Sequence, residues 1–352
     1  MTTIDKTRPV LVTGATGYVA GWIIKLLLEE GVTVHAAVRN PDDKKKIAHL
    51  DKIAASTDGK IKYFKTDLLK EGSYLDAMQG CELVFHTASP FTTNVKDPQK
   101  ELIEPAVKGT ENVLNSVNKT PSVKRVVLTS SCAAVATDAI DCQSAPNGIL
   151  TEEIWNTTAS LDYMPYSYSK TLAEKRAWEI AEGQSRWDLV TINPSLVLGP
   201  MLNPKYTTSE SLNILKPFAD GSMKMGTPNI GTGVVDVRDV AKSHILAGYT
   251  PSARGRYITS GHNTSFLEMA IALQTKFGAD YPLPTKALPK WLLLAVGPIM
   301  NKLFTRKIIR NNVNVEYKAD NSKIKNELGM EFMPLKNTME DSFQVLADEK
   351  II

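Results

Sequence analysis

A tyrosine and a lysine four residues apart, Tyr166 and Lys170, have the types and spacing that most suggest chemistry in this sequence. On a helix, this spacing puts both side chains on one face, one turn apart. Hydride transfer to a carbonyl carbon builds an alkoxide that needs a proton, and a phenol can donate it. Because a phenol is a weak acid, an ammonium group one turn away helps by favouring the ionised form. Chance supplies about one such pair in a chain of this composition, so the context decides its meaning.

A serine, Ser131, completes a possible catalytic set with Tyr166 and Lys170. It lies just after the strand expected at 125–128, and the helix with the other two follows along the chain. All three should meet at the carboxyl edge of a parallel sheet, where ligands of such sheets bind. The serine hydroxyl can hydrogen-bond to the substrate oxygen, and the lysine can also hold ribose hydroxyls of a nucleotide. Three neighbours remain alternatives for the serine and tyrosine roles: Ser130, Tyr163 and Tyr168.

A glycine-rich turn occupies residues 13–20, between a strand expected at 10–12 and a helix expected at 18–30. Glycines at the first two motif positions let the backbone turn tightly and approach a pyrophosphate, and Ala20 supplies the small third residue. The helix N-terminus adds unpaired N–H groups and a favourable dipole. The turn therefore predicts dinucleotide binding, with a tight turn that holds no ligand as the alternative. The expected contacts from this segment are Gly14, Thr16, Gly17, Tyr18 and Val19.

The end of the second expected strand, at 32–38, predicts which dinucleotide binds. NAD-selective sites carry a carboxylate about 20 residues after the glycines, to hold the ribose 2′-OH. Here Arg39 follows the strand instead, and its planar fork suits a 2′-phosphate. Lys46, in a run of three lysines, is expected to assist. The predicted cofactor is therefore NADP(H).

Four further cofactor contacts are expected at strand ends. Asp67 and Leu68 follow the third strand and should meet the adenine edge, although helix N-capping is an alternative for the aspartate. Ala88 and Ser89 follow the fourth strand, where the ribose passes.

The first half of the chain alternates short β-branched runs with helical patterns, which indicates an α/β fold with a doubly wound parallel sheet of the Rossmann type. The strands are expected at 10–12, 32–38, 61–64, 83–85, 125–128 and 189–192. This alternation of strands and helices ends after Pro194. We expect a cofactor domain formed by residues 1–194 with about 232–250, and a smaller C-terminal substrate lobe formed by 195–231 and 251–352.

Composition and charge exclude several classes of protein. Hydrophobic content of 43% and charged content of 22% are ordinary for a globular protein. A net charge of +3, with no basic run interleaved with aromatics, argues against a nucleic-acid binder. The five histidines are dispersed, so no metal site is expected.

The sequence also favours a cytoplasmic location without an integral membrane span. Three scattered cysteines suggest reduced thiols, and residues 1–9 lack the apolar region of a secretory signal. The longest apolar run, at 291–300, is roughly half the ~20 residues needed to cross a bilayer. We interpret it as a lobe helix with a solvated basic end, with peripheral membrane contact or an oligomer surface as alternatives.

Taken in order, these motifs resemble the extended, atypical branch of the short-chain dehydrogenase/reductase superfamily. They are Thr13 to Ala20, His86 to Pro90, Leu128 to Ser131, Tyr166 to Lys170, Asn193-Pro194 with Gly199-Pro200, and Val235 to Ala241. Three further segments are similar to the dihydroflavonol 4-reductase, cinnamoyl-CoA reductase and yeast ketone/aldehyde reductase group. These segments are Ala88 to Phe91, Lys96 to Pro98, and Glu104 to Thr110.

The resemblance implies NADPH-dependent reduction of a ketone or aldehyde to an alcohol, with Pro194 beside the nicotinamide. It implies a small carbonyl substrate, with Phe91, Thr92 and residues 201–225 near it, and it leaves the monomer and the homodimer open. Three other functions remain as alternatives. These are a hydroxysteroid dehydrogenase, a sugar-nucleotide epimerase or dehydratase, and a non-catalytic dinucleotide-sensing protein.

Overall fold

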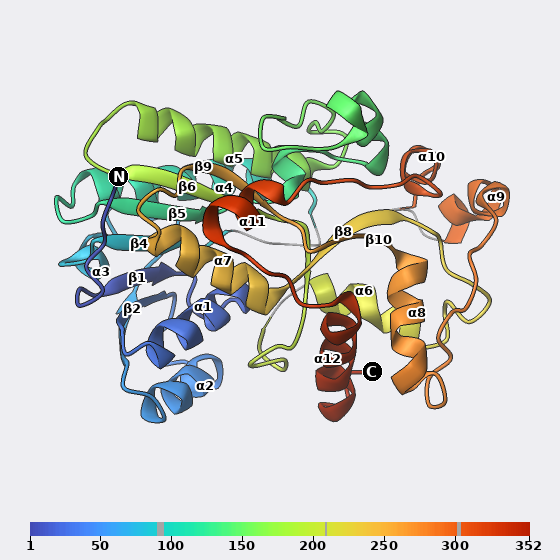
Figure 1. Cartoon of the computed structure of the whole chain (residues 1–352), viewed down its shortest axis with the longest axis horizontal. Coiled ribbons are helices and arrows are strands. Elements are labelled where there is room, and N and C mark those ends of the chain that lie inside the picture. Colours follow the sequence, from blue (N-terminus) through green and yellow to red (C-terminus); the bar gives the residue numbers. More distant parts are fainter. Residues whose placement is uncertain (90–94, 208–209, 301–303) are drawn as a thin grey trace.

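A seven-stranded parallel sheet forms the larger part of the protein (Figure 1). The computed structural model describes residues 1–89, 95–207, 210–300 and 304–352. In spatial order the strands are β3 (Lys60–Lys65), β2 (Thr33–Val38), β1 (Val10–Thr13), β4 (Leu83–His86), β5 (Arg125–Thr129), β6 (Asp188–Pro194) and β9 (Gly255–Thr259). Crossovers leave β1 in both directions, so the predicted doubly wound Rossmann fold is confirmed.

Helices cover both faces of this sheet, because side chains of successive strand residues point to opposite faces. In β1, Val10 and Val12 pack into one layer and Leu11 packs into the other. The first layer contains α1 (Tyr18–Glu29), α2 (Lys44–Ala55), α7 (Val237–Tyr249) and α11 (Ser322–Leu328). The second layer contains α3 (Leu75–Met78), α4 (Glu104–Asn118) and α5 (Pro165–Glu182). A π-helical turn, Gln99–Ile103, precedes α4.

A second, three-stranded sheet lies beside the first and carries the remaining helices (Figure 1). Its strands are β10 (His262–Ser265), β8 (Gly231–Asp236) and β7 (Leu196–Leu198). A separate apolar core joins it to α6 (Glu210–Ala219), α8 (Phe266–Phe277) and α12 (Leu335–Asp348). A smaller apolar cluster joins α9 (Lys290–Met300) to α10 (Arg306–Asn312). Three 3₁₀ turns, Cys132–Ala134, Ala139–Ser144 and Pro146–Gly148, lie between β5 and α5.

The chain passes between the two sheets several times. Strand β6 of the large sheet ends at Pro194, and β7 of the small sheet begins at Leu196. Strand β8 belongs to the small sheet, and α7 returns to the large one. Strand β9 lies within the range expected for the lobe, yet it pairs with β6 as the seventh strand of the large sheet. Each sheet is therefore built from segments that are discontinuous in sequence.

The described residues contain no helix that is both long and apolar enough to cross a membrane. The apolar run predicted as a lobe helix is α9, which has 11 residues. All three cysteines are free and buried.

An ion pair between a buried arginine and a half-buried aspartate holds the amino-terminal edge of the large sheet. Arg125, at the start of β5, is fully buried and donates from Nε and Nη2 to the Asp188 carboxylate at 2.7 and 3.0 Å. Its Nη1 donates to the carbonyls of Ala247 and Thr250 at the end of α7, at 3.0 and 2.6 Å. Because a buried guanidinium is costly without partners, this pair should matter for stability. It lies at the start of the strands, away from their carboxyl ends.

A buried carboxyl on α7 predicts a specific dependence of stability on pH. Burial, helped by the nearby Asp236 carboxylate, raises the pKa of Asp239 from 3.8 to about 6. The folded state therefore holds this proton more tightly than the unfolded chain. The resulting stability is fully present below about pH 4 and is lost as the pH rises through about 6. The side chain of the Asp239→Asn variant cannot ionise. The free energy of unfolding of this variant, relative to that of the parent protein, should therefore rise by up to about 3 kcal/mol between about pH 4 and about pH 7.

Thermal unfolding of both proteins across this pH range measures the effect. Asparagine keeps the oxygen that accepts the Met333 N–H at 2.8 Å, so the contact itself is preserved. A difference in Tm that stays constant with pH would show that Asp239 does not titrate in this window.

Candidate active site

The glycine turn has the geometry of a phosphate-binding turn. Gly14 has φ +64°, and a Cβ at this position would lie 2.9 Å from the Cα of Ala88. Glycine is therefore the residue that suits this position, because it tolerates the positive φ and has no Cβ to clash with Ala88. Gly17 donates its N–H to the Gly14 carbonyl at 2.8 Å and begins α1 without a side-chain cap. The first turn of α1, which includes Tyr18 and Val19, thus presents backbone N–H groups at a positive helix end.

Thr13 and His86 fix the ends of the two strands beside this turn. The Thr13 hydroxyl oxygen accepts the N–H groups of Thr87 and Ala88, both at 3.1 Å. The same hydroxyl forms a hydrogen bond with His86 Nδ1, 2.9 Å away. Burial, with a smaller effect of Lys170, lowers the pKa of His86 to about 3. His86 is therefore a neutral packing residue that joins β1 to β4.

The residues expected at the adenosine end lie at the ends of β2 and β3. Arg39 is exposed directly after β2 and forms no ion pair with any described residue. Lys46 Nζ already lies 3.9 Å from the Asp43 carboxylate. Asp67 accepts the N–H of Leu69 at 2.9 Å, which makes a local turn and does not cap a helix. Arg39 is thus a cation that this edge leaves without an ion pair among the described residues.

Leu68 and Thr16 complete the predicted cofactor contacts on this side. The Leu68 side chain packs against Gly109 of α4, where an added Cβ would lie 2.6 Å from its Cγ. Its carbonyl accepts from the Asn112 side chain at 2.9 Å, so packing holds the residue in place. Thr16 is partly exposed in the glycine turn.

Helix α5 presents Tyr166 and Lys170 at the carboxyl edge of the sheet. Pro165 is its first residue, which suits a position whose N–H has no partner within the helix. Tyr166 is 38% exposed, and Lys170 Nζ lies 5.9 Å from the centre of its ring. The same ammonium donates to Ser89 Oγ at 3.1 Å. The structure therefore brings together the tyrosine, the lysine and a predicted ribose contact.

Ser131 lies beside this group, after β5. Its hydroxyl oxygen accepts the Ala133 N–H at 3.1 Å and begins the 3₁₀ turn Cys132–Ala134, against which α5 packs. The hydroxyl hydrogen has no acceptor among the described residues. Asn193 Nδ2 holds the Ser131 carbonyl at 3.2 Å, and buried Pro194 follows at the end of β6. The ends of β5 and β6 and the start of α5 thus meet at one place.

Two of the alternative residues have their hydroxyls committed elsewhere. Ser130 is buried and donates to the Glu174 carboxylate. Tyr163 donates to Asp138 at 2.7 Å. Phe91 and Thr92, predicted near the substrate, lie outside the described residues.

A model of the 3-beta hydroxysteroid dehydrogenase/isomerase family matches residues 11–256, which is more than half of the chain. The chain belongs to this family. It is 39% identical over 346 residues to a cinnamoyl-CoA reductase of Medicago truncatula, covering 97% of this chain and 96% of that protein. It is also 37% identical to tetraketide alpha-pyrone reductase 1 of Arabidopsis thaliana, covering 97% and 95%.

Solved structures of reductases share the whole fold. The yeast methylglyoxal/isovaleraldehyde reductase in complex with NADPH aligns with a TM-score of 0.76 at 28% identity, over 98% of this chain and all of that one. Vestitone reductase of alfalfa aligns with a TM-score of 0.74 at 25% identity, over 98% and 99%. The predicted superfamily and group are thereby confirmed. This family member is an oxidoreductase, and NADP(H) is the cofactor of the reductase group to which it belongs.

The sequence did not predict the contacts between α1 and the segment that follows β7. The Tyr18 hydroxyl donates to the Gly199 carbonyl at 2.6 Å, and Trp22 Nε1 donates to the Pro200 carbonyl at 2.9 Å. Both donors face the lobe from α1, whose first turn belongs to the glycine motif. The helical spacing of these aromatics is visible in the sequence, but the carbonyls that they contact lie about 180 residues away.

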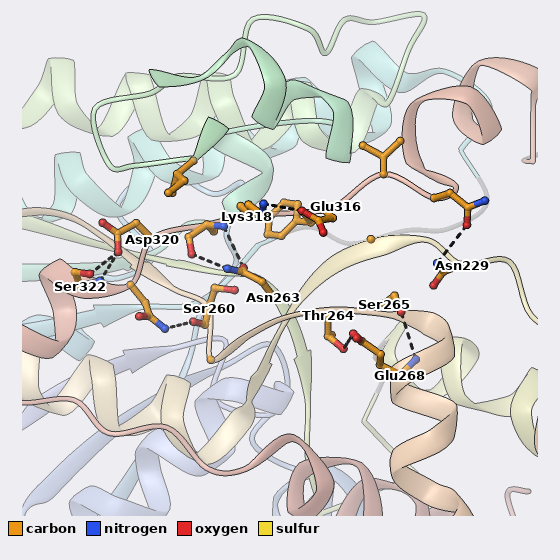
Figure 2. Close-up of a pocket in the computed structure, with 18 of the residues that line it drawn as sticks. Asn229, Ser260, Asn263, Thr264, Ser265, Glu268, Glu316, Lys318, Asp320 and Ser322 are labelled. Atoms are coloured by element: carbon orange, nitrogen blue, oxygen red, sulfur yellow. Dashed lines mark hydrogen bonds and ion pairs between the residues drawn. The ribbon is translucent and has the colours of Figure 1, made fainter. Parts of the chain in front are cut away.

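A large hollow of about 1130 Å³ lies elsewhere, between β10, the start of α8 and residues 314–325 (Figure 2). None of Ser131, Tyr166 and Lys170 lines it. Several of its polar side chains pair with one another, as Figure 2 shows for Thr264 with Glu268 at 2.8 Å. This hollow is therefore separate from the candidate catalytic residues. Among the described residues, no group of three potential ligands could hold a metal ion.

Proposed function

We propose that this protein is an NADPH-dependent reductase that converts a ketone or an aldehyde to an alcohol. The observation that carries the proposal is the start of α5. It presents Tyr166 and Lys170 where Ser89 and the Ser131 turn also lie. The reductase relatives support the reaction class, since they include a cinnamoyl-CoA reductase and a methylglyoxal/isovaleraldehyde reductase.

Each catalytic residue has a role that its contacts support. Bound NADPH supplies the hydride. The Tyr166 hydroxyl gives its proton to the alkoxide oxygen, which completes the alcohol. Lys170 stabilises the resulting phenolate and holds the nicotinamide ribose, beside Ser89. Ser131 donates to the carbonyl oxygen, because its own oxygen is occupied by the Ala133 N–H.

The proposed contacts to NADPH begin at the glycine turn and at the end of β2. The uncapped start of α1, with Gly14, Thr16 and Gly17, suits the pyrophosphate. Arg39 suits the 2′-phosphate, because it is exposed and has no ion pair with a described residue.

The remaining predicted contacts extend the site along the cofactor. Asp67 and Leu68 are assigned to the adenine, Ala88 to the ribose and Pro194 to the nicotinamide. Residues after Pro194, apart from the segments that return to the large sheet, form the substrate lobe of this proposal.

Oxidation of NADPH with a panel of carbonyl compounds tests the proposal. The panel contains aldehydes, α-keto esters, diketones, flavanones and ketosteroids, with NADH measured in parallel. We expect turnover with at least one class and a preference for NADPH. Turnover confined to ketosteroids would instead support a hydroxysteroid dehydrogenase, which the family model favours. Tight NADPH binding without turnover would support a dinucleotide-sensing protein.

A further inference from the structure

The face of α5 that carries Tyr166 and Lys170 continues one turn further to Glu174. The three residues are spaced at i, i+4 and i+8, so they lie in a row along the helix. Exposure falls along this row from 38% at Tyr166 to 1% at Glu174. A charged side chain that is almost fully buried needs a specific set of partners.

The Glu174 carboxylate accepts hydrogen bonds from three strands of the large sheet. Oε2 accepts from the Ser130 hydroxyl at the end of β5 and from Asn193 Nδ2 on β6 at 2.7 Å. Oε1 accepts from Arg256 Nε on β9 at 2.7 Å and lies 3.2 Å from Thr191 Oγ1 on β6. One side chain of α5 therefore fixes this helix against β5, β6 and β9.

Two of these contacts reach the candidate catalytic serine. Ser130 is its neighbour in the chain, and Asn193 uses the same amide nitrogen to hold the Ser131 carbonyl at 3.2 Å and the Glu174 carboxylate. Glu174 is thus connected through one residue to Ser131 and through two helical turns to Tyr166.

The charge of Glu174 is balanced within the same network. Arg256 is buried, donates from Nη1 to the carbonyls of Glu152 and Ile154 at 2.7 and 2.6 Å, and lies 3.9 Å from the ring of Trp155. Since the guanidinium balances the carboxylate, the effect of Glu174 on the site is expected to come from geometry.

We propose that Glu174 is a positioning residue that sets the placement of Tyr166 relative to Ser131. This inference rests on the proposed function, because it assumes that these two residues act on the substrate. Ser130 and Asn193, which bind Glu174, lie at the carboxyl ends of β5 and β6. A misplacement of about 1 Å at a catalytic site can cost about 10²-fold in rate.

Glu174→Gln tests the inference. The amide nitrogen must face a donor, and Arg256 loses its charged partner, so the helix should shift from the strand ends. We expect kcat to fall by about 10- to 100-fold, while the dissociation constant of NADPH changes by less than about twofold. Both kcat and the dissociation constant are measured at a temperature well below the Tm of the variant, so that the protein stays folded.

Asp188→Asn is the matched control. It makes the same chemical change at the opposite end of the sheet and also leaves a buried guanidinium, Arg125, without its charged partner. Both variants should lower Tm, but only Glu174→Gln should lower kcat. The positioning role would be overturned if neither variant lowered kcat, or if both variants lowered kcat to the same extent.

A second pair of variants decides the matter even if Glu174→Gln does not fold. Ser130→Ala and Trp178→Phe each remove one hydrogen bond to Glu174. Trp178, which is also on α5, donates from Nε1 to Glu174 Oε1 at 3.4 Å. Only Ser130→Ala should lower kcat, by several-fold. A comparable effect of both variants would contradict the inference. If Tyr166→Phe abolishes turnover while none of these variants lowers kcat, the proposed function stands and the positioning role fails.

Discussion

Replacing Tyr166 with phenylalanine is expected to lower kcat by about 10²- to 10⁴-fold, the range that a positioned proton donor contributes. The binding of NADPH should change by less than about twofold, since the tyrosine ring is kept and the residues assigned to the cofactor are unchanged. Lys170 will still reach Ser89 Oγ, now 3.1 Å away, so the ribose side of the site is preserved. Steady-state turnover and cofactor titration by fluorescence measure the two quantities separately.

Tyr163→Phe is the matched control for this substitution. It removes a phenol hydroxyl three residues earlier, one that donates to Asp138 at 2.7 Å. We expect a lower Tm, because the buried Asp138 carboxylate loses a donor, and a kcat that stays within several-fold of the parent. A Tyr166→Phe protein with nearly full turnover would show that another group donates the proton.

The parts of the site that could be predicted from the sequence are those encoded over short distances. The glycine turn could be predicted because Gly14 has a positive φ and lies close to Ala88, and only glycine tolerates both. The spacing of Tyr166 and Lys170 fixes their common face as soon as a helix is assumed. Ser131 follows a β-branched run, and the carboxyl ends of parallel strands share one edge. Local rules therefore place these residues together.

The parts that could not be predicted depend on pairs far apart in the chain. Glu174 meets Arg256 across 82 residues, and neither position has a local pattern that marks it as buried. Strand β9 is short and begins at a glycine, so nothing in its composition assigns it to the large sheet. Tyr18 contacts Gly199 across 181 residues for the same reason. Tertiary packing decides these contacts.

Replacing Arg39 with alanine is expected to weaken NADPH binding by about 10- to 100-fold while NADH binding changes by less than about threefold. A hydrogen bond to a charged group contributes about 1.5–3 kcal/mol, and only NADPH has the 2′-phosphate that Arg39 would contact. The side chain is exposed at the end of β2 and has no ion pair with a described residue, so its loss should not disturb the fold. Arg39→Asp should go further and favour NADH, because a carboxylate repels the phosphate and can accept a ribose hydroxyl.

Lys46→Ala separates a specific phosphate contact from a general loss of positive charge. It removes the same charge near the start of α2, from a lysine that already lies 3.9 Å from the Asp43 carboxylate. The loss of NADPH affinity should therefore be several-fold smaller than for Arg39→Ala. The salt dependence of binding adds a second measurement, since its slope should fall more for the arginine variant. Equal weakening of NADPH and NADH in Arg39→Ala would mean that the arginine does not read the 2′-phosphate, and the cofactor preference would then have to come from another cation at this edge.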